Sequence, residues 1–96
     1  MHVGVARVEL RLAENHSLKG KRMVVRSVVQ RLRNRFNVAV AEVATQDDWQ
    51  TATLGIACVS GDARHANEML DKAVAFVEGE RLDAELGAVE IEIVAV

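Results

Sequence analysis

Several residue types that constrain a chain are scarce or missing in this sequence. There is no proline, so nothing imposes a helix kink or a stiff linker. There is one cysteine, Cys58, which cannot form an internal disulfide and is typical of a reducing compartment. Aromatic residues make up only 3% of the chain, and none lies in a segment with strand-like alternation. This scarcity argues against a sheet that recognises RNA by stacking bases on its surface.

Long apolar runs are also missing. No apolar segment approaches the length of a membrane span. Residues 1–8 alternate, whereas a secretory leader would begin with positive charge and continue as an apolar helical stretch. We therefore expect a cytoplasmic protein without a membrane association. The composition, 50% hydrophobic and 27% charged, is that of an ordinary globular domain, and no repeat or Gly/Ser-rich stretch divides it. Residues 1–96 are expected to form one domain with a modest core.

Hydrophobic periodicity predicts two helices and four strands. The first segment alternates with period two, so that Ala6, Val8 and Leu10 share one side. The period then changes to that of a helix, and Ser17 is placed to cap it because its hydroxyl can accept from an unpaired backbone N–H. A second helix is expected to end near Gly79. The elements are expected at residues 2–12, 18–36, 37–45, 51–60, 61–79 and 89–93, with a polar hairpin loop at 46–50 and a turn near 82–86.

The order βαββαβ predicts an α+β fold of the ferredoxin-like type. Two helices would cover one face of a four-stranded antiparallel sheet, with the last strand beside the first. Arg7 and Arg11 would then lie within cross-strand reach of Glu90 and Glu92 on the open face. The same face would carry apolar side chains that a monomer leaves in water, so we hypothesise self-association through this face or a sheet edge. These side chains are Val3, Val5, Ala57, Val59, Val94 and Val96.

Positive charge is concentrated in one segment. Residues 17–36 hold seven lysines and arginines and no acid, whereas the rest of the chain holds five basic residues and all fourteen acids. On a helical projection six of these seven basic residues form two stripes. One stripe lies within an arc of about 60° and consists of Lys19, Arg22, Arg26 and Arg33; the other consists of Arg31 and Arg35.

The first turn of this helix is locally unfavourable. Lys19, Lys21 and Arg22 stand where the helix dipole is positive, and each cation there costs roughly 0.3 to 1 kcal/mol at low salt. Gly20 in the same turn costs about 0.5 to 1 kcal/mol relative to alanine. A bound anion would meet free N–H groups, the dipole and the cations together. We therefore predict phosphate contacts here, with Ser17 as cap and anion donor. The candidate residues are Ser17, Lys19, Lys21, Arg22, Arg26 and Arg33.

Two interpretations of this helix stay open. In the first it binds a nucleic-acid backbone, the commonest ligand that offers many phosphates in a row. In the second it is the solvated basic side of a domain whose second helix supplies compensating charge through Glu68, Asp71 and Glu78. A KH-type loop does not fit, because no second glycine follows Gly20 at the required position. Binding would therefore use phosphates and structure, with little base readout.

No other residues form a catalytic or metal-binding pattern. Cys58 is expected to be a small buried hydrophobe, and the three histidines show no ligand spacing. Asp47 and Asp48 are typical of a turn, with acid–base or cation chemistry as the alternative. Trp49 is expected to pack under the hairpin, with a stacking or partner-contact role as the alternative. Gly55 is expected to allow the close approach of another backbone. We expect neither an enzyme nor a cofactor.

Four segments are distinctive when they are taken jointly. They are Ser17-Leu18-Lys19-Gly20-Lys21-Arg22, Arg31-Leu32-Arg33-Asn34-Arg35-Phe36-Asn37-Val38, Ala41-Glu42-Val43 and Asp48-Trp49-Gln50. Together they resemble the bacterial YlxP-like family of uncharacterised domains, and the match runs essentially the full chain. The resemblance implies a ferredoxin-like fold and a family often encoded beside translation-initiation and ribosome-maturation factors. It implies no established activity and no catalytic residues to carry over.

These observations lead to two function hypotheses. The first is an RNA- or ribosome-associated binding protein, with ribosomal RNA favoured as the partner because of the family resemblance. The alternative is a homo-oligomeric structural or protein-interaction module, such as a homodimer, that uses the open sheet face.

Overall fold

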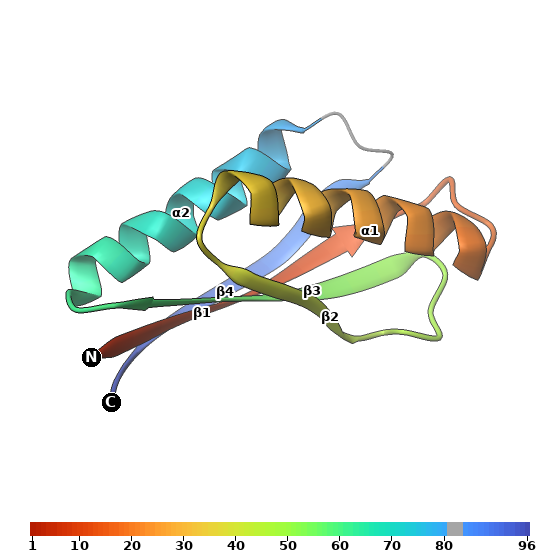
Figure 1. The fold of residues 1–96 in the computed structure, drawn as a ribbon. Coiled ribbons are helices and arrows are strands. Elements are labelled where there is room, and N and C mark those ends of the chain that lie inside the picture. The colour runs from red at the N-terminus through yellow and green to blue at the C-terminus, as the bar shows by residue number, and fades with distance from the viewer. Residues whose placement is uncertain (81–83) are drawn as a thin grey trace.

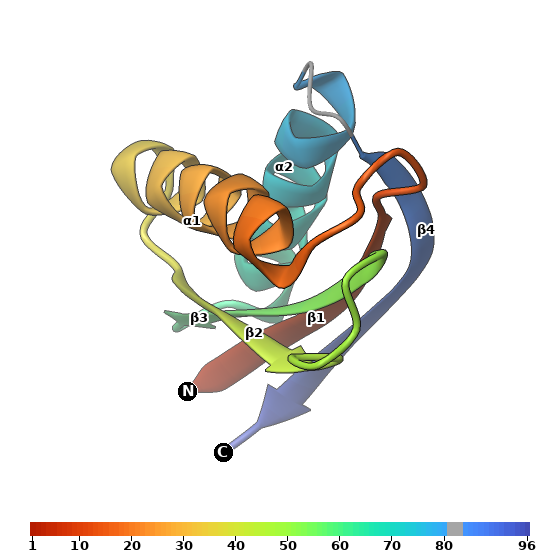
Figure 2. The same cartoon turned by 90° about the vertical axis from the view of Figure 1, so that its right-hand side faces the viewer.

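The computed structural model describes residues 1–80 and 84–96. Within them the order of elements is βαββαβ, as the periodicity predicts (Figure 1). The strands form one sheet, and both helices lie on the same face of it (Figure 2). The elements are β1 His2–Arg11, α1 Leu18–Arg35, β2 Ala39–Ala44, β3 Thr51–Ser60, α2 Ala63–Gly79 and β4 Glu85–Ala95.

The sheet has the strand order β2-β3-β1-β4, so the last strand lies beside the first. β1 pairs antiparallel with β3 along its whole length without a register shift, starting with His2 opposite Ser60. On its other side β1 pairs antiparallel with β4, with one irregularity between Val8 and Leu10. Two helices on one face of this antiparallel sheet confirm the predicted ferredoxin-like α+β fold.

Local signals explain where the helices begin and end. α1 begins after Ser17, whose Oγ accepts a hydrogen bond from the N–H of Gly20 at 3.0 Å, which confirms the predicted cap. α2 begins after Asp62, whose carboxylate accepts a backbone N–H of the first turn at 3.0 Å. α1 ends at Arg35 rather than Phe36, because Phe36 has extended backbone angles and only its N–H still bonds to the helix.

The core lies between the helices and the covered face of the sheet. Small side chains at Ala66 and Ala73 let α2 lie close to the strands. Gly4 serves the same close packing, since a Cβ at this position would lie 2.9 Å from Cδ1 of Leu70. Cys58 is buried in this core, as predicted. The buried apolar residues are Ala6, Val8, Leu10, Leu12, Val28, Leu32, Val40, Ala52, Leu54, Ile56, Cys58, Ala66, Leu70, Ala73 and Val77.

Three strands differ from their predicted bounds, and β1 does so by one residue because it ends at Arg11 and not at Leu12. β2 is shorter than the predicted segment 37–45, and its pairing with β3 shifts register between Glu42 and Ala44. β4 begins at Glu85, inside the predicted turn, because pairing with β1 includes residues that do not alternate in the sequence. Residues 82 and 83 of that predicted turn lie outside the described residues.

Candidate functional site

Lys21, in the first turn of α1, is buried beneath the loop that joins β2 to β3. Only 1% of its side chain is exposed, and its Nζ lies 2.9 Å from Oε2 of Glu42. The same ammonium donates to the backbone carbonyls of Thr45, of Gln46 at 3.4 Å and of Thr51 at 3.3 Å. The predicted phosphate contact at Lys21 is therefore wrong, because oxygens of the protein itself already surround this charge.

The oxygens around the Lys21 ammonium, from Glu42, Thr45, Gln46 and Thr51, are called here the Lys21 cage. This cage holds an unusual turn at the end of β2. Thr45 has a φ of 66°, in the left-handed region that β-branched residues rarely adopt. Its Oγ1 accepts the N–H of Thr53 at 2.9 Å, which takes the place of a backbone acceptor at the point where the β2–β3 register shifts. Its carbonyl accepts from Lys21. The buried ammonium therefore fixes the start of the β2–β3 loop against α1.

Gly20 also has an explanation within the fold. A Cβ at this position would overlap Oδ1 of Asn15. The amide of Asn15 donates to the carbonyl of Ser17 at 2.7 Å and to the carbonyl of Trp49. Asn15 thus bridges the start of α1 and the β2–β3 loop, and only glycine leaves room for it. Gly20 and Lys21, both unfavourable in an isolated first turn, therefore serve the tertiary structure.

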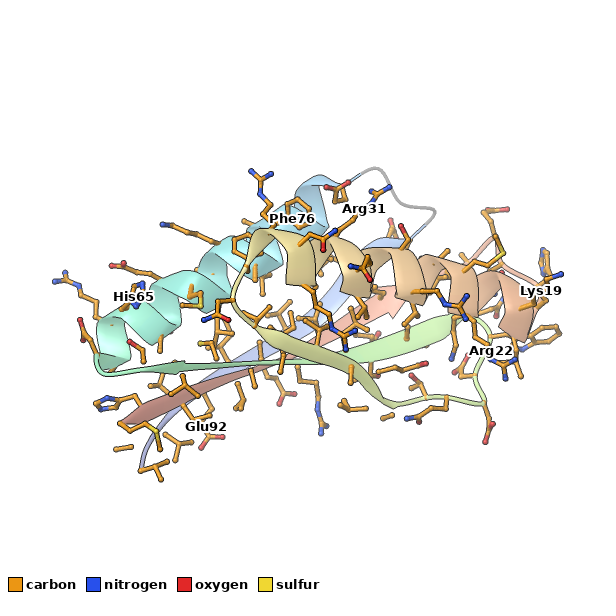
Figure 3. All side chains as sticks on the ribbon, viewed as in Figure 1. Lys19, Arg22, Arg31, His65, Phe76 and Glu92 are labelled. Atoms are coloured by element: carbon orange, nitrogen blue, oxygen red, sulfur yellow. The ribbon has the colours of Figure 1, made fainter. Side chains whose placement is uncertain are left out.

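The stripe formed by Arg31 and Arg35 faces α2. Nη1 of Arg31 lies 2.7 Å from Oε2 of Glu80. The guanidinium of Arg35 lies over the ring of Phe76, 5.1 Å from its centroid. Figure 3 shows Arg31 and Phe76 near the middle of the helical layer, toward the C-terminal parts of α1 and α2. These cations are engaged within the chain, as the second interpretation expects, although the acid is the C-cap residue Glu80 rather than one inside α2.

The other stripe, called here the basic stripe, is exposed along the side of α1 that faces β2. None of its first three members has an acid within 4.0 Å among the described residues. The fourth, Arg33, donates from Nη2 to the carbonyl of Val40 at 2.9 Å. Since a guanidinium has five N–H donors, Arg33 keeps donors for a ligand. The stripe spans about 21 Å along the helix axis. Its members are Lys19, Arg22, Arg26 and Arg33.

The structure thus brings most of the predicted site residues to one surface. Lys19 and Arg22 lie at the end of the molecule where α1 begins (Figure 3). Ser17 is exposed next to them. Its hydroxyl oxygen accepts from Gly20, and in the described part of the chain its proton is not used in a hydrogen bond. Lys21 is the one member of the predicted set that the fold withdraws from this surface.

Trp49, in the β2–β3 loop, is 51% exposed, so the expectation that it packs under the hairpin is wrong. The turn around it is nevertheless well connected. Oδ1 of Asp48 accepts the N–H groups of Gln50 at 2.8 Å and Thr51 at 3.1 Å, which confirms the predicted turn role of Asp48. The carbonyl of Trp49 accepts from Asn15. A turn fixed by hydrogen bonds therefore exposes an indole to solvent.

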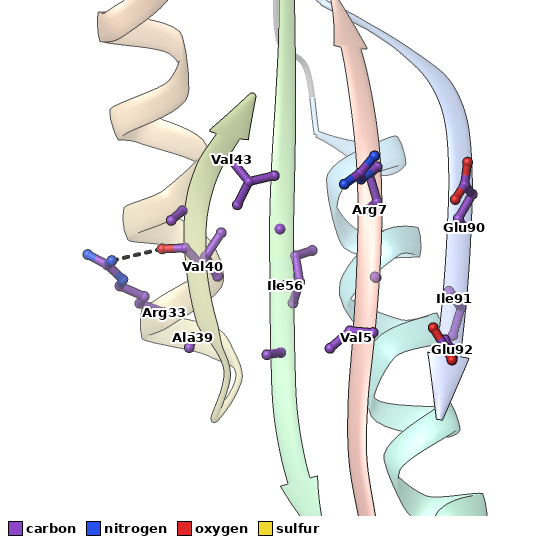
Figure 4. Close-up of a pocket in the computed structure, with 14 residues that line it drawn as sticks. Val5, Arg7, Arg33, Ala39, Val40, Val43, Ile56, Glu90, Ile91 and Glu92 are labelled. Carbon is purple, nitrogen blue, oxygen red and sulfur yellow. Dashed lines mark hydrogen bonds between the residues drawn. The ribbon is translucent and has the colours of Figure 1, made fainter. Parts of the chain in front are cut away.

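The open face of the sheet carries a groove of about 1040 Å³ (Figure 4). Val5 and Val43 lie along its sides and are 38% and 49% exposed, which confirms the predicted apolar character of this face. A Cβ at Gly55 would lie 2.7 Å from Cγ1 of Val43. Gly55 therefore makes room for a side chain, not for another backbone as predicted. The small residues of the groove floor are Ala39, Ala41, Gly55 and Ala57.

Charges of both signs flank this groove. Arg7 lies opposite Glu90 in the β1–β4 register, as predicted (Figure 4). Arg11 instead lies opposite Glu85, and its Nε is 3.0 Å from Oε1 of Glu9 on the same strand. The predicted contact of Arg11 with Glu90 or Glu92 is therefore wrong, because the antiparallel register places Arg11 near the beginning of β4.

Other chemistry-bearing residues serve the fold. Sγ of Cys58 lies 3.7 Å from the carbonyl oxygen of Ala66 inside the core. Over residues 1–80 and 84–96, no group of three or more His, Cys, Asp or Glu side chains could hold a metal ion. Neither helix in this part of the chain is long and apolar enough to cross a membrane.

Two residues that organise the site were missed in the sequence. Glu42 neutralises Lys21, and its signal was available because it is the only charged residue in the apolar segment 39–44. Asn15 joins the start of α1 to Trp49, but its side chain bridges residues that are far apart in the chain, so no local pattern identifies it.

Comparisons with known proteins agree with the resemblance indicated by the four segments. Residues 3–91 match the model of a family described as Protein of unknown function (DUF503). The chain is also 36% identical over 76 residues to the Uncharacterized protein YlxP of Bacillus subtilis (strain 168), an alignment that covers 79% of this chain and 83% of that relative. The chain therefore belongs to this YlxP-like family of proteins of unknown function.

Proposed function

We propose that this protein binds RNA, with ribosomal RNA as the favoured partner, through phosphate contacts made by the basic stripe of α1. The observation that supports this proposal is that some basic residues of the helix are paired within the chain and others are not. Lys21, Arg31 and Arg35 are engaged by groups of the chain itself. Lys19 and Arg22 are exposed on one stripe without an acid in reach among the described residues. Uncompensated cations in a row are what a phosphate backbone requires.

The spacing of the stripe suits a backbone rather than a single anion. At about 1.5 Å per residue, Lys19, Arg22 and Arg26 follow each other along the helix axis at intervals of about 4.5 and 6 Å. Arg33 lies about 10 Å further on. Long side chains at such intervals can each reach a different phosphate of one strand. The proposal also agrees with the scarcity of aromatic residues, because phosphate contacts position a nucleic acid without reading its bases.

The proposal predicts a specific change in salt dependence. A triple variant, Lys19→Gln, Arg22→Gln and Arg26→Gln, removes three cations from the stripe. A matched control, Arg7→Gln, Arg64→Gln and Lys72→Gln, removes three exposed cations from other surfaces. Filter binding of a structured ribosomal RNA fragment at several salt concentrations measures the slope of log K against log salt. The stripe variant should lose about 2 to 3 units of slope, and the control should keep the wild-type slope. Equal slopes for the stripe variant, the control and the wild type would refute the proposal.

A second candidate function is a homo-oligomeric module that uses the open sheet face, because this face combines a hollow with projecting side chains. The hollow lies over β2 and β3, where Ala39, Ala41 and Ala57 line it, and Val43 packs over Gly55. The projecting side chains lie on β1 and β4, where Val5 and Val94 are exposed. A twofold axis lying in the plane between two facing copies, parallel to the strands, would place the valines of each copy over the hollow of the other.

Charge favours a contact through the face over one through the β4 edge. Two copies of β4 paired antiparallel about Ile91 would place Glu90 directly opposite Glu92 of the other copy, which is repulsive. A contact through the face instead brings Arg7, Glu90 and Glu92 of both copies into one interface, where charges of both signs are present. The dimer proposed here is therefore a stack of two sheets with a helical layer on each outer side.

A charge exchange tests this dimer. Arg7→Glu alone and Glu90→Arg with Glu92→Arg alone should each be monomeric, because each homodimer would contain like charges twice. An equal mixture of the two variants should form a heterodimer, because residues 7, 90 and 92 are then all acidic in one copy and all basic in the other. Analytical ultracentrifugation of the wild type, of each variant and of the mixture measures this. A monomeric wild type at high concentration, or variants that stay dimeric alone, would contradict the second candidate.

A further inference from the structure

The tryptophan of the β2–β3 loop is an exposed aromatic side chain on a braced turn. Half of Trp49 is in water, although it is the only tryptophan of the chain and one of its largest apolar groups. Hydrogen bonds fix the turn on both sides of Trp49. On one side the Asp48 carboxylate accepts the backbone N–H groups of Gln50 and Thr51. On the other side the Lys21 ammonium donates to the carbonyls of residues 45 and 46. The backbone from which the indole projects is therefore fixed before any ligand arrives.

The same loop is tied to the beginning of the basic stripe. One side-chain nitrogen of Asn15 donates both to the carbonyl of Ser17, the N-cap of α1, at 2.7 Å and to the carbonyl of Trp49. The backbone of Trp49 therefore lies against the first turn of α1, the turn that carries Lys19 and leads to Arg22. The loop with the exposed ring is thus tied to the end of the molecule where Figure 3 shows Lys19 and Arg22, both exposed.

We propose that Trp49 stacks on an unpaired nucleobase of an RNA strand whose phosphates contact Lys19 and Arg22. This inference rests on the proposed RNA-binding function and names its ligand as RNA with at least one unpaired base. Base–aromatic stacking tolerates any base, because every base has a π face, and cations beside the ring hold the adjoining backbone. Because the backbone of the turn is held and a tryptophan side chain has only two torsions, little conformational freedom is lost when a base stacks on the ring.

Negative charge next to the ring keeps phosphate contacts apart from base stacking. The hollow beside Trp49 is lined by residues 45–49, and it includes the carboxylates of Asp47 and Asp48. Negative charge repels a phosphate from this hollow, whereas the flat face of a base carries no formal charge. The backbone is therefore directed along α1, and only a base enters the space beside the indole.

Tryptophan fluorescence tests the inference directly, because Trp49 is the only tryptophan. Stacking of a base should quench its emission when oligouridylate binds, whereas inorganic polyphosphate should bind the stripe without this quenching. Trp49→Ala should weaken oligouridylate binding by about 5- to 150-fold. Trp49→Phe should restore most of it, because phenylalanine keeps a stacking face. Binding of a blunt-ended RNA duplex should be the same for Trp49→Ala and the wild type.

The failure of this inference differs from the failure of the proposed function. If Trp49→Ala binds oligouridylate like the wild type while Lys19→Gln with Arg22→Gln loses binding, base stacking is refuted and phosphate binding stands. If neither variant changes RNA binding, both proposals are refuted. If Trp49→Ala weakens duplex and oligouridylate equally, the loop acts through the fold and stacking is refuted. Circular dichroism melting of each variant confirms that it is folded.

Discussion

Replacement of Lys21 by methionine is the perturbation that best separates a buried structural cation from a ligand-binding one. Methionine has a similar length and an apolar end, so Lys21→Met keeps most of the volume and removes only the charge and its donors. The variant leaves Glu42, whose side chain is 15% exposed, without its partner. It also removes a donor from the carbonyls of Thr45, Gln46 and Thr51.

The expected loss is large for a domain of this size. Removal of one partner of a buried ion pair costs about 3 to 5 kcal/mol, because the remaining charge stays desolvated and unpaired. In a domain of this length each kcal/mol lowers the melting temperature by roughly 4 to 8 °C, so a fall of roughly 12 to 40 °C is expected. A double variant, Lys21→Met with Glu42→Gln, removes the stranded charge as well. It should be more stable than Lys21→Met alone.

Urea denaturation followed by circular dichroism measures these differences, with equal m-values as evidence that the compared states are alike. Lys19→Met is the matched control, because Lys19 is exposed and lies in the same turn. It should change the free energy of unfolding by less than about 0.5 kcal/mol. A loss below about 1 kcal/mol for Lys21→Met, or a double variant as unstable as the single one, would refute the reasoning about the cage.

Further predictions concern glycines and the opposite side of α1. Gly4→Ala should destabilise the fold by about 1 to 3 kcal/mol, because a Cβ there meets Leu70, Cys58 and Ile93. Gly79→Ala should be neutral or stabilising, because a Cβ there has nothing within 4 Å. Thermal melts of both variants measure the difference. Gly20→Ala should destabilise the wild type because of Asn15, yet stabilise an Asn15→Ala background by about 0.5 to 1 kcal/mol; stabilisation in both backgrounds by urea titration would contradict the role of Asn15. Arg31→Gln with Arg35→Gln should lower the RNA salt slope less than two substitutions in the basic stripe, because these cations face α2.

Local patterns in the sequence were sufficient for the architecture. Period-two alternation in β1 and the change of period after Ser17 determine the type of those elements, and caps such as Ser17 and Asp62 determine where the helices start. The bounds of β4 were not predictable, because pairing with β1 draws residues 85–88 into the sheet without an alternating signal. Short-range physics therefore identifies the elements, and long-range pairing sets the ends of the strands.

The features of the candidate site likewise fall into those that the sequence shows and those that only the tertiary structure decides. The sequence by itself shows that α1 is the basic side of the chain and that its cations form stripes. Only the tertiary structure decides which of these cations are free. Lys21 and Arg22 are neighbours in the chain, yet a helix turns about 100° per residue, so the first enters the cage made by Glu42 and the β2–β3 loop while the second stays in water. Whether a charge meets a partner depends on contacts between segments distant in the chain, and local sequence patterns do not contain those contacts.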